Sequence, residues 1–290
     1  FAYDFEYTAS DGQTLYFNIL DKSAKTVAVT SKNSSGNSYT LSKYDIPARI
    51  SYNGTTYDVT EIGESAFWGC TSVKSVTMPY QLKKIADQAF YNCSSLQTIG
   101  WSGYLESIGS YAFNGCSSLV AINIPSEVTT IGVSAFTDCT KLSSVTMPAS
   151  VKTIGECAFS FCTSLTSVAI PSSVTTIGDH AFWSCKSLES VILPSSVSSI
   201  GRGAFYLCSK ITEPIYNANC FAYLPTSYKG SYTIPDGIKQ IAGWAFKNCG
   251  LTTVNIPSSV TTIDEGAFHG SPYLSSVVIP DGVNKIDSIE

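Results

Sequence analysis

The chain has 290 residues, of which 44% are hydrophobic and 13% charged, and its formal net charge is −5 at pH 7. This composition indicates a folded protein rather than a disordered one, and the lack of any basic run argues against nucleic acid or anionic membrane as partners. No stretch of the sequence is long and apolar enough for a transmembrane helix, so we expect no membrane insertion within this chain.

Residues 1–45 have the pattern of a small antiparallel β structure. Leu15, Phe17 and Ile19 alternate with outward positions, and Asp11-Gly12 is typical of a hairpin turn. We interpret this region as a β cap that covers the first coil of the repeat that follows, because that coil would otherwise expose an apolar face to water.

Residues 46–208 are built from a repeat of 23 residues. An Ala-Phe pair marks each copy, from Ala66-Phe67 to Ala204-Phe205, and the whole unit reads Leu-x-x-Val-x-Ile-Pro-x-x-Val-x-x-Ile-Gly-x-x-Ala-Phe-x-x-Cys. A fixed period in the twenties predicts a solenoid of stacked supersecondary units.

Each unit predicts one coil of that solenoid. Val168 and Ile170 alternate with their neighbours as in a short strand with one buried face, and Pro171 ends the strand. The apolar spacing over 158–162 suits a helical or 3₁₀ turn with its apolar side inward. We therefore expect coils of about 23 residues, with short parallel strands stacked at about 4.8 Å.

Eight of the ten cysteines share one position of the repeat, three residues after the Phe. Neighbouring copies all point the same way, so we expect buried free thiols that fill space rather than disulfides. Cys157 and Cys220 lie outside this position, and the sequence leaves both free and paired states open for them.

Residues 209–231 break the register, and residues 232–290 return to it and stop within a repeat. The irregular segment holds five aromatic residues, which are Tyr216, Phe221, Tyr223, Tyr228 and Tyr232. One interpretation is a partner site that includes Tyr223 and Tyr228. The other is a structural plug between two stacks of coils.

Two surfaces of the regular coils are further candidates for binding. The outward strand positions, such as Thr77, Asn123 and Thr146, form a flat polar surface that suits a broad, weak contact or serves solubility alone.

The position after the Phe carries aromatic residues in four copies: Trp68, Tyr91, Trp183 and Tyr206. Phe161, Tyr111 and Trp244 occupy positions beside it. These rings either shield the edge of the coils or anchor a partner.

The sequence has no motif of an enzyme, a cofactor site or a metal site. Its two histidines, His180 and His269, lie in different repeats, and we interpret them as solvated surface residues. We therefore expect a protein that is not an enzyme and needs no cofactor or metal.

The 23-residue unit resembles the BspA-type leucine-rich repeat over residues 46–290, and the stretch at 223–235 resembles a recurrent feature of the same family. The resemblance implies a right-handed β/α superhelix in a secreted or surface-anchored bacterial protein. It also implies adhesion to host extracellular matrix or cell-surface proteins. The chain begins at Phe1 without Met, so we expect that a leader has been removed. A passive spacer that presents another domain and a glycan-binding module with surface aromatics are the alternatives.

Overall fold

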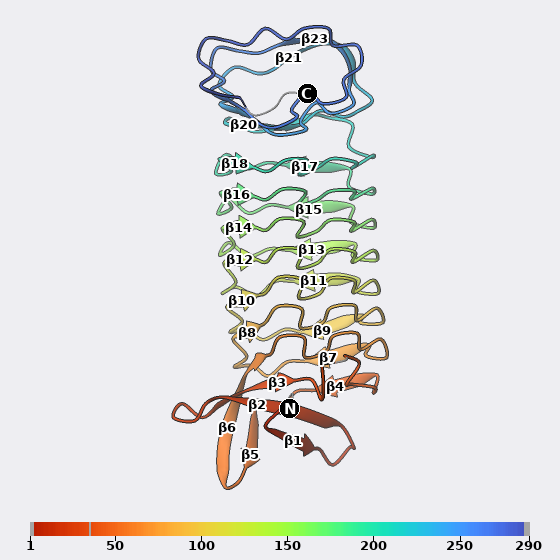
Figure 1. Ribbon diagram of the computed structural model, residues 1–290, viewed down its shortest axis with the longest axis vertical. Helices are drawn as coiled ribbons and strands as arrows, with labels where there is room; N and C mark the ends of the chain where they lie inside the picture. The colour runs from red at the N-terminus through yellow and green to blue at the C-terminus, as the bar shows by residue number, and fades with distance from the viewer. Residues whose placement is uncertain (1–2, 35, 287–290) are drawn as a thin grey trace.

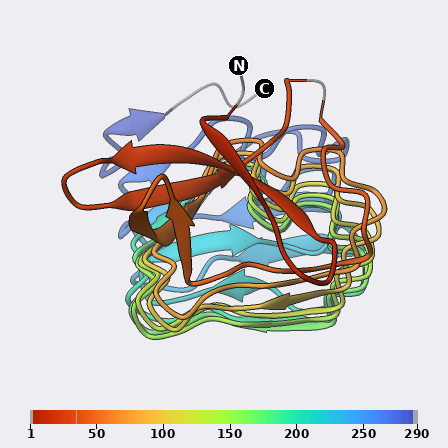
Figure 2. The same cartoon turned by 90° about the horizontal axis from the view of Figure 1, so that it is seen from below.

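The computed structural model describes residues 3–34 and 36–286. Figure 1 shows the coils lying one above another along the long axis, from the N-terminal strands at the bottom to the C-terminal coils at the top. Seen along that axis in Figure 2, successive coils follow nearly the same outline. The predicted solenoid is confirmed.

The first three strands form the expected antiparallel cap: β1 (Phe5–Thr8), β2 (Thr14–Asp21) and β3 (Thr26–Thr30). After them, β4 (Lys43–Asp45) pairs parallel with β7 (Ser75–Thr77), and β5 (Arg49–Tyr52) and β6 (Thr55–Ile62) form a hairpin. β2 pairs antiparallel with both β1 and β3, and Gly12 in the β1–β2 turn has a φ of 87°. β3 pairs parallel with β6 and so joins the cap to the coils.

Two sides of each regular coil are short parallel strands, whereas the repeat predicted one strand in each coil. One side holds β8 (Lys84–Ile85), β10 (Ser107–Ile108), β12 (Thr130–Ile131), β14 (Thr153–Ile154), β16 (Thr176–Ile177) and β18 (Ser199–Ile200). The other side, which we call the strand face, holds β7 (Ser75–Thr77), β9 (Thr98–Gly100), β11 (Ala121–Asn123), β13 (Ser144–Thr146), β15 (Ser167–Ala169) and β17 (Ser190–Ile192). Paired residues such as Ile131 and Ile154 occupy the same position in successive repeats.

The third side, which we call the turn face, runs from the Gly of each repeat to its Cys. The prediction of a helical or 3₁₀ turn here is wrong, because the described residues contain no helix. Within the first turn, the amides of Ala66 and Trp68 donate to Gly63 O and Ser65 O, while the intervening amide of Phe67 donates to Ala89 O of the next coil at 2.7 Å. A helix needs every amide for its own turn, whereas stacking takes every second amide here.

Left-handed backbone makes this alternation possible. In all nine coils the residue before the Ala-Phe pair has a positive φ, as Ser65 does at 54°. The residue before the Cys position does the same, as Gly69 does at 67°. Such residues turn the chain and aim alternate amides toward the neighbouring coil.

The phenylalanines of the repeat form a column of stacked rings from Phe67 to Phe205, and Phe246 and Phe268 stack separately in the C-terminal coils. Phe159 is fully buried, and its ring centroid lies 5.4 Å from those of Phe136 and Phe182. At the N-terminal end Tyr39 takes the place of a further Phe and stacks on Phe67 at 4.2 Å.

All ten cysteines are free, as expected for the eight in the repeat, and Cys157 and Cys220 are free as well. The thiols do more than fill space. Cys139 Sγ donates to Phe113 O at 3.3 Å, in the preceding coil, and Cys162 Sγ donates to Phe136 O at 3.2 Å. Ser271, which replaces the ninth Cys, donates to Phe246 O at 2.9 Å. The position therefore suits a small side chain that can donate a hydrogen bond.

The irregular segment joins two hydrophobic cores. Its strands and those that follow are β19 (Ile215–Tyr216), β20 (Cys220–Tyr223), β21 (Lys229–Thr233), β22 (Gln240–Ile241), β23 (Gly250–Asn255), β24 (Thr262–Ile263) and β25 (Lys285–Ile286). Every residue of β20 is buried. Ala222 and Tyr223 pack in the N-terminal core and Phe221 in the C-terminal one. We call the boundary between β18 and β20 the junction.

Candidate functional site

The strand face presents the flat polar surface that the sequence predicted. Thr77, Asn123 and Thr146 are all exposed, and Asn123 pairs with Thr146 across β11 and β13. The largest exposed apolar side chain on this face is Ile192, at 86%. Small side chains offer little area for a tight anchor, so this face alone supports only a broad contact.

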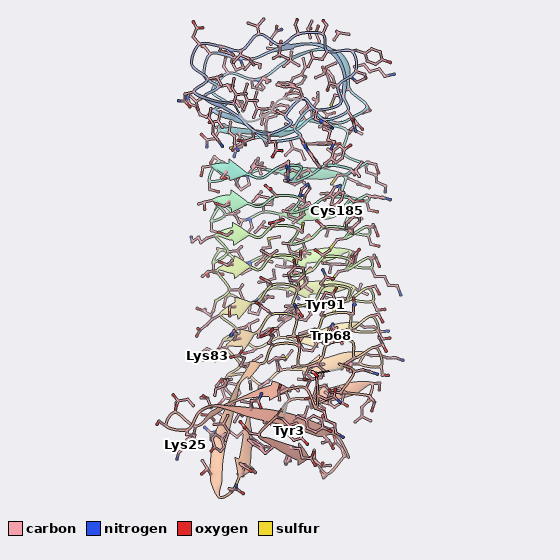
Figure 3. The ribbon with its side chains drawn as sticks, viewed as in Figure 1. Tyr3, Lys25, Trp68, Lys83, Tyr91 and Cys185 are labelled. Atoms are coloured by element: carbon pink, nitrogen blue, oxygen red, sulfur yellow. The ribbon has the colours of Figure 1, made fainter. Side chains whose placement is uncertain are left out.

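The turn face exposes two aromatic side chains in the N-terminal coils. Trp68 is 37% exposed and Tyr111 is 39% exposed, while Tyr91 between them is half-buried. Figure 3 shows Trp68 and Tyr91 close together in neighbouring coils. Gly36 packs so closely on the indole of Trp68 that a side-chain carbon there would lie 2.9 Å from Cε3. This contact orients the indole.

Nearer the junction the aromatic residues meet in one group, which we call the corner cluster: Phe161, His180, Trp183, Tyr206 and Trp244. The ring centroids are 4.9 Å apart for Phe161 and Trp183, 5.1 Å for His180 and Trp244, and 5.6 Å for Tyr206 and Trp244. Trp244 reaches the earlier coils because the irregular segment has no regular turn of its own. Instead, the amide of Gly203 donates directly to Gly243 O at 2.9 Å.

Two cations lie against the corner cluster. Lys247 Nζ is 3.2 Å from the centroid of the Trp244 ring, and the Arg202 guanidinium is 5.4 Å from it. Cations over an indole face are attracted by its quadrupole. Burial and the nearby charge of Arg202 lower the pKa of Lys247, and burial is the main cause that lowers the pKa of His180.

The sequence identified four of the five rings of this cluster as candidates. It did not indicate that Arg202 and Lys247 lie against these rings. His180 lies half-buried between Trp183 and Trp244 rather than fully solvated. No local pattern marks these residues, because their contacts depend on how the irregular segment brings two distant repeats together.

The two candidate binding tyrosines of the irregular segment, Tyr223 and Tyr228, differ in their exposure to solvent. Tyr223 is 3% exposed, and its burial raises the pKa of its hydroxyl. Tyr228 is half-buried, with its ring 5.3 Å from that of Tyr232. Tyr223 does not face solvent in this arrangement, which favours the structural plug over the partner site.

The junction opens a groove beside the ends of β18, β22 and β24, with a volume of about 630 Å³. We call it the junction groove. Its lining residues are Asp179, Ser198, Ser199, Ile200, Gly201, Arg202, Lys239, Gln240, Thr261, Thr262, Asp264, Glu265 and Lys285. At its base, Gln240 Nε2 donates to Ile200 O at 3.2 Å and Gln240 Oε1 accepts from the Ile200 amide at 3.4 Å.

Within the described residues, no group of three or more His, Cys, Asp and Glu side chains is placed to hold a metal ion. The same residues contain no helix that is long and apolar enough to cross a membrane.

Comparison with known proteins places this architecture among bacterial repeat proteins. The sequence model of a family described as "BspA type Leucine rich repeat region (6 copies)" matches residues 49–162, 129–226 and 215–289. A leucine rich cell surface protein from Faecalibacterium prausnitzii A2-165 is 26% identical, with a TM-score of 0.68 over 99% of this chain and 86% of that one. A leucine-rich repeat protein from Bacteroides ovatus ATCC 8483 is 25% identical, with a TM-score of 0.56 over 98% and 90%.

The pneumococcal vaccine antigen PcpA has a similar fold, with 20% identity and a TM-score of 0.61 over 98% of this chain and 72% of that one. No curated protein matches the chain.

Proposed function

Because the chain belongs to the BspA-type leucine-rich repeat family, we propose that it is a non-enzymatic bacterial protein, secreted or held at the cell surface, that binds a partner protein through its turn face. The likeness to a solved cell surface protein over nearly the whole chain supports this location. The partner that we propose is a protein of the host extracellular matrix or of a host cell surface.

The observation that carries the proposal is the line of aromatic side chains along the turn face. Trp68 and Tyr111 each expose more than a third of their surface two coils apart, and neither is part of the core column of phenylalanines. Tryptophan and tyrosine are enriched among the few residues that dominate the binding energy of protein interfaces, because they bury a large area at a low cost in side-chain entropy. Half-buried Tyr91, in the coil between them, adds a third aromatic side chain to this line.

The remaining surface suits the rim of such an interface. Exposed polar residues such as Glu64, Gln88 and Asn92 lie on the turn face beside these aromatic side chains. Because each regular coil presents similar surroundings, contacts on several coils can add up to a broad interface.

The proposal is tested by presenting the chain, held on a surface by a C-terminal tag, with solubilised extracellular matrix proteins and mucus proteins. Captured proteins are identified by mass spectrometry, purified, and titrated by surface plasmon resonance. We expect at least one to bind saturably and to be displaced by free chain. If no protein binds saturably, the proposal is wrong and a passive spacer becomes the better account.

A further inference from the structure

We propose that the junction groove is a second binding site, which takes a neutral oligosaccharide. The groove lies beside β18 and β22, whereas Trp68 and Tyr111 of the proposed protein site lie in the N-terminal coils. The inference therefore concerns another class of ligand and does not depend on a protein partner.

The groove exists because the stack is interrupted there. Along the regular coils, one strand follows another at the spacing of a hydrogen-bonded ladder, which leaves no room between them. After β18 the ladder stops, and the side chain of Gln240 bonds to Ile200 in place of a strand. A side chain is narrower than a strand, so the surface opens around it. The volume of about 630 Å³ is within the range of roughly 300–1,000 Å³ that is common for small-ligand sites.

The charges of the lining favour an uncharged ligand. Three cations, Arg202, Lys239 and Lys285, stand among the three carboxylates of Asp179, Asp264 and Glu265. Arg202 pairs with Glu265 and Lys285 pairs with Asp264. The charges of the lining therefore largely offset one another and give no strong preference for an anion or a cation. A ligand rich in hydroxyl groups can meet both kinds of charged group, since a hydroxyl donates to a carboxylate and accepts from an ammonium or guanidinium group.

The neutral side chains of the lining add to this preference. Ser198, Ser199, Thr261 and Thr262 bring hydroxyl groups that both donate and accept, and Ile200 is the one large apolar residue of the lining. A ligand that needs an apolar pocket finds none here, whereas a saccharide finds partners along both walls.

Arg202 gives the groove a donor that is already oriented. Its Nη1 donates to Glu265 Oε2 at 2.8 Å, and its guanidinium lies over the Trp244 ring. Its Nε is buried and has no hydrogen-bond partner within the part of the chain that the structure describes. A buried donor without an acceptor is unfavourable. The remaining guanidinium nitrogens, which the ion pair with Glu265 holds in place, are the donors that a ligand hydroxyl in the groove can meet.

The test uses the whole chain and one variant that fills the groove. In Ser198→Trp, a large side chain replaces an exposed serine of the lining and removes no contact that the fold needs. The matched control is Thr129→Trp, at the equivalent exposed position three coils earlier on the same side. Should Ser198→Trp melt below the wild type, Lys239→Ala combined with Thr262→Val takes its place, because these changes remove polar groups without adding bulk.

The probes are immobilised neutral oligosaccharides of glucose, mannose, galactose, xylose and N-acetylglucosamine, next to sialylated and sulfated ones and a peptide of alternating Lys and Glu. We expect saturable binding to at least one neutral oligosaccharide, with a Kd on the order of 1 mM or below. By calorimetry, Ser198→Trp should weaken that binding at least about tenfold and Thr129→Trp should leave it unchanged.

Three results would overturn the proposal: no saturable binding to any neutral probe, binding of the charged probes alone, or equal affinity of Ser198→Trp and wild type. A chain that binds a neutral oligosaccharide but no protein would support this inference while contradicting the proposed protein partner.

Discussion

The side-chain amide of Gln240 bonds to both backbone polar groups of Ile200 that face the junction. In the regular coils a strand fills that role, as when the amide of Gly201 donates to Ile177 O at 2.8 Å. Gln240 also donates to the carboxylate of Asp264 and accepts from Cys220 Sγ at 3.2 Å. The Gln240 side chain thus covers the open edge of β18 and links this strand to Asp264 and Cys220.

Gln240→Leu should therefore destabilise the protein. It leaves the amide and carbonyl of Ile200 without partners, and each unpaired buried group costs about 1–3 kcal/mol. We expect a loss of about 2 kcal/mol in the free energy of unfolding, measured by urea denaturation. Gln97→Leu, at an exposed position, is the control. An equal loss in the two variants would show that Gln240 does not hold the junction.

The column of phenylalanines gives a second prediction. Phe159→Ala removes a fully buried ring between two stacked neighbours and should cost about 3–5 kcal/mol in unfolding free energy. Phe161→Ala, two residues later on the turn face, should cost about 1 kcal/mol because that ring is only partly buried. Chemical denaturation of both variants measures the difference. A loss below about 1 kcal/mol for Phe159→Ala would contradict the stacked core.

The buried thiols predict a loss of stability at alkaline pH. Burial raises the pKa of Cys70 to about 11 and that of Cys116 well above its usual value. An unfolded thiol titrates near pH 8.5, so above this pH the unfolded chain loses protons that the folded chain keeps. The stability from the thiols is complete below about pH 8.5 and declines as the pH rises toward 11.

Urea denaturation at about pH 7.5 and pH 10 measures this decline, and Cys116→Ser combined with Cys139→Ser should make it smaller. The serines can keep the hydrogen bonds to Phe90 O and Phe113 O, as Ser271 does with Phe246 O. A decline of the same size in the variant would show that the thiols do not cause it.

The left-handed positions of the turn face give a prediction that rests on backbone geometry. Leu207 has a φ of 63° and is 42% exposed, so its side chain contributes little packing. Leu207→Gly should change the unfolding free energy by only about 0.5 kcal/mol, because relief of the left-handed cost offsets the greater freedom of the unfolded chain. Leu207→Val should lose more than about 1 kcal/mol, since a branched Cβ fits this conformation poorly. Equal melting temperatures for Gly and Val would contradict the geometry.

The repeat made the stack predictable because every period carries the same constraint. Phe159 could be assigned to the core from the sequence alone, since each Phe can be buried only against its own copies. The free thiols followed from the same argument, although the hydrogen bond from Cys139 to Phe113 O did not. That bond depends on the direction of a carbonyl, which hydrophobic spacing does not reveal.

The turn face could not be derived from spacing because two structures share the same apolar pattern. Ala158, Phe159 and Cys162 would point inward from a helical turn or from successive β-turns. The two structures differ in the backbone amides, half of which donate to the next coil here. They also differ in the positive φ values of residues such as Cys157 and Phe161, which the sequence does not indicate as a glycine would.

The junction depends on contacts between residues that are far apart in the sequence. Gln240 and Ile200 are separated by 40 positions, and Tyr206 meets Asn248 across 42. The number of residues that the irregular segment uses for β19 and β20 determines which repeats come together. A periodic pattern holds no information about a segment that departs from it, so neither the junction groove nor the placement of Arg202 and Lys247 could be predicted.

The central claim is that the exposed aromatics of the turn face bind a partner protein. Its most direct test is the affinity of the isolated partner for Trp68→Ser combined with Tyr111→Ser, measured by calorimetry beside the wild type and beside Thr77→Ala combined with Thr146→Ala on the strand face. We expect the aromatic variant, at a temperature where circular dichroism shows it fully folded, to lose at least about tenfold in affinity, and the strand-face variant to lose less than about threefold. Unchanged affinity in the aromatic variant would contradict the claim.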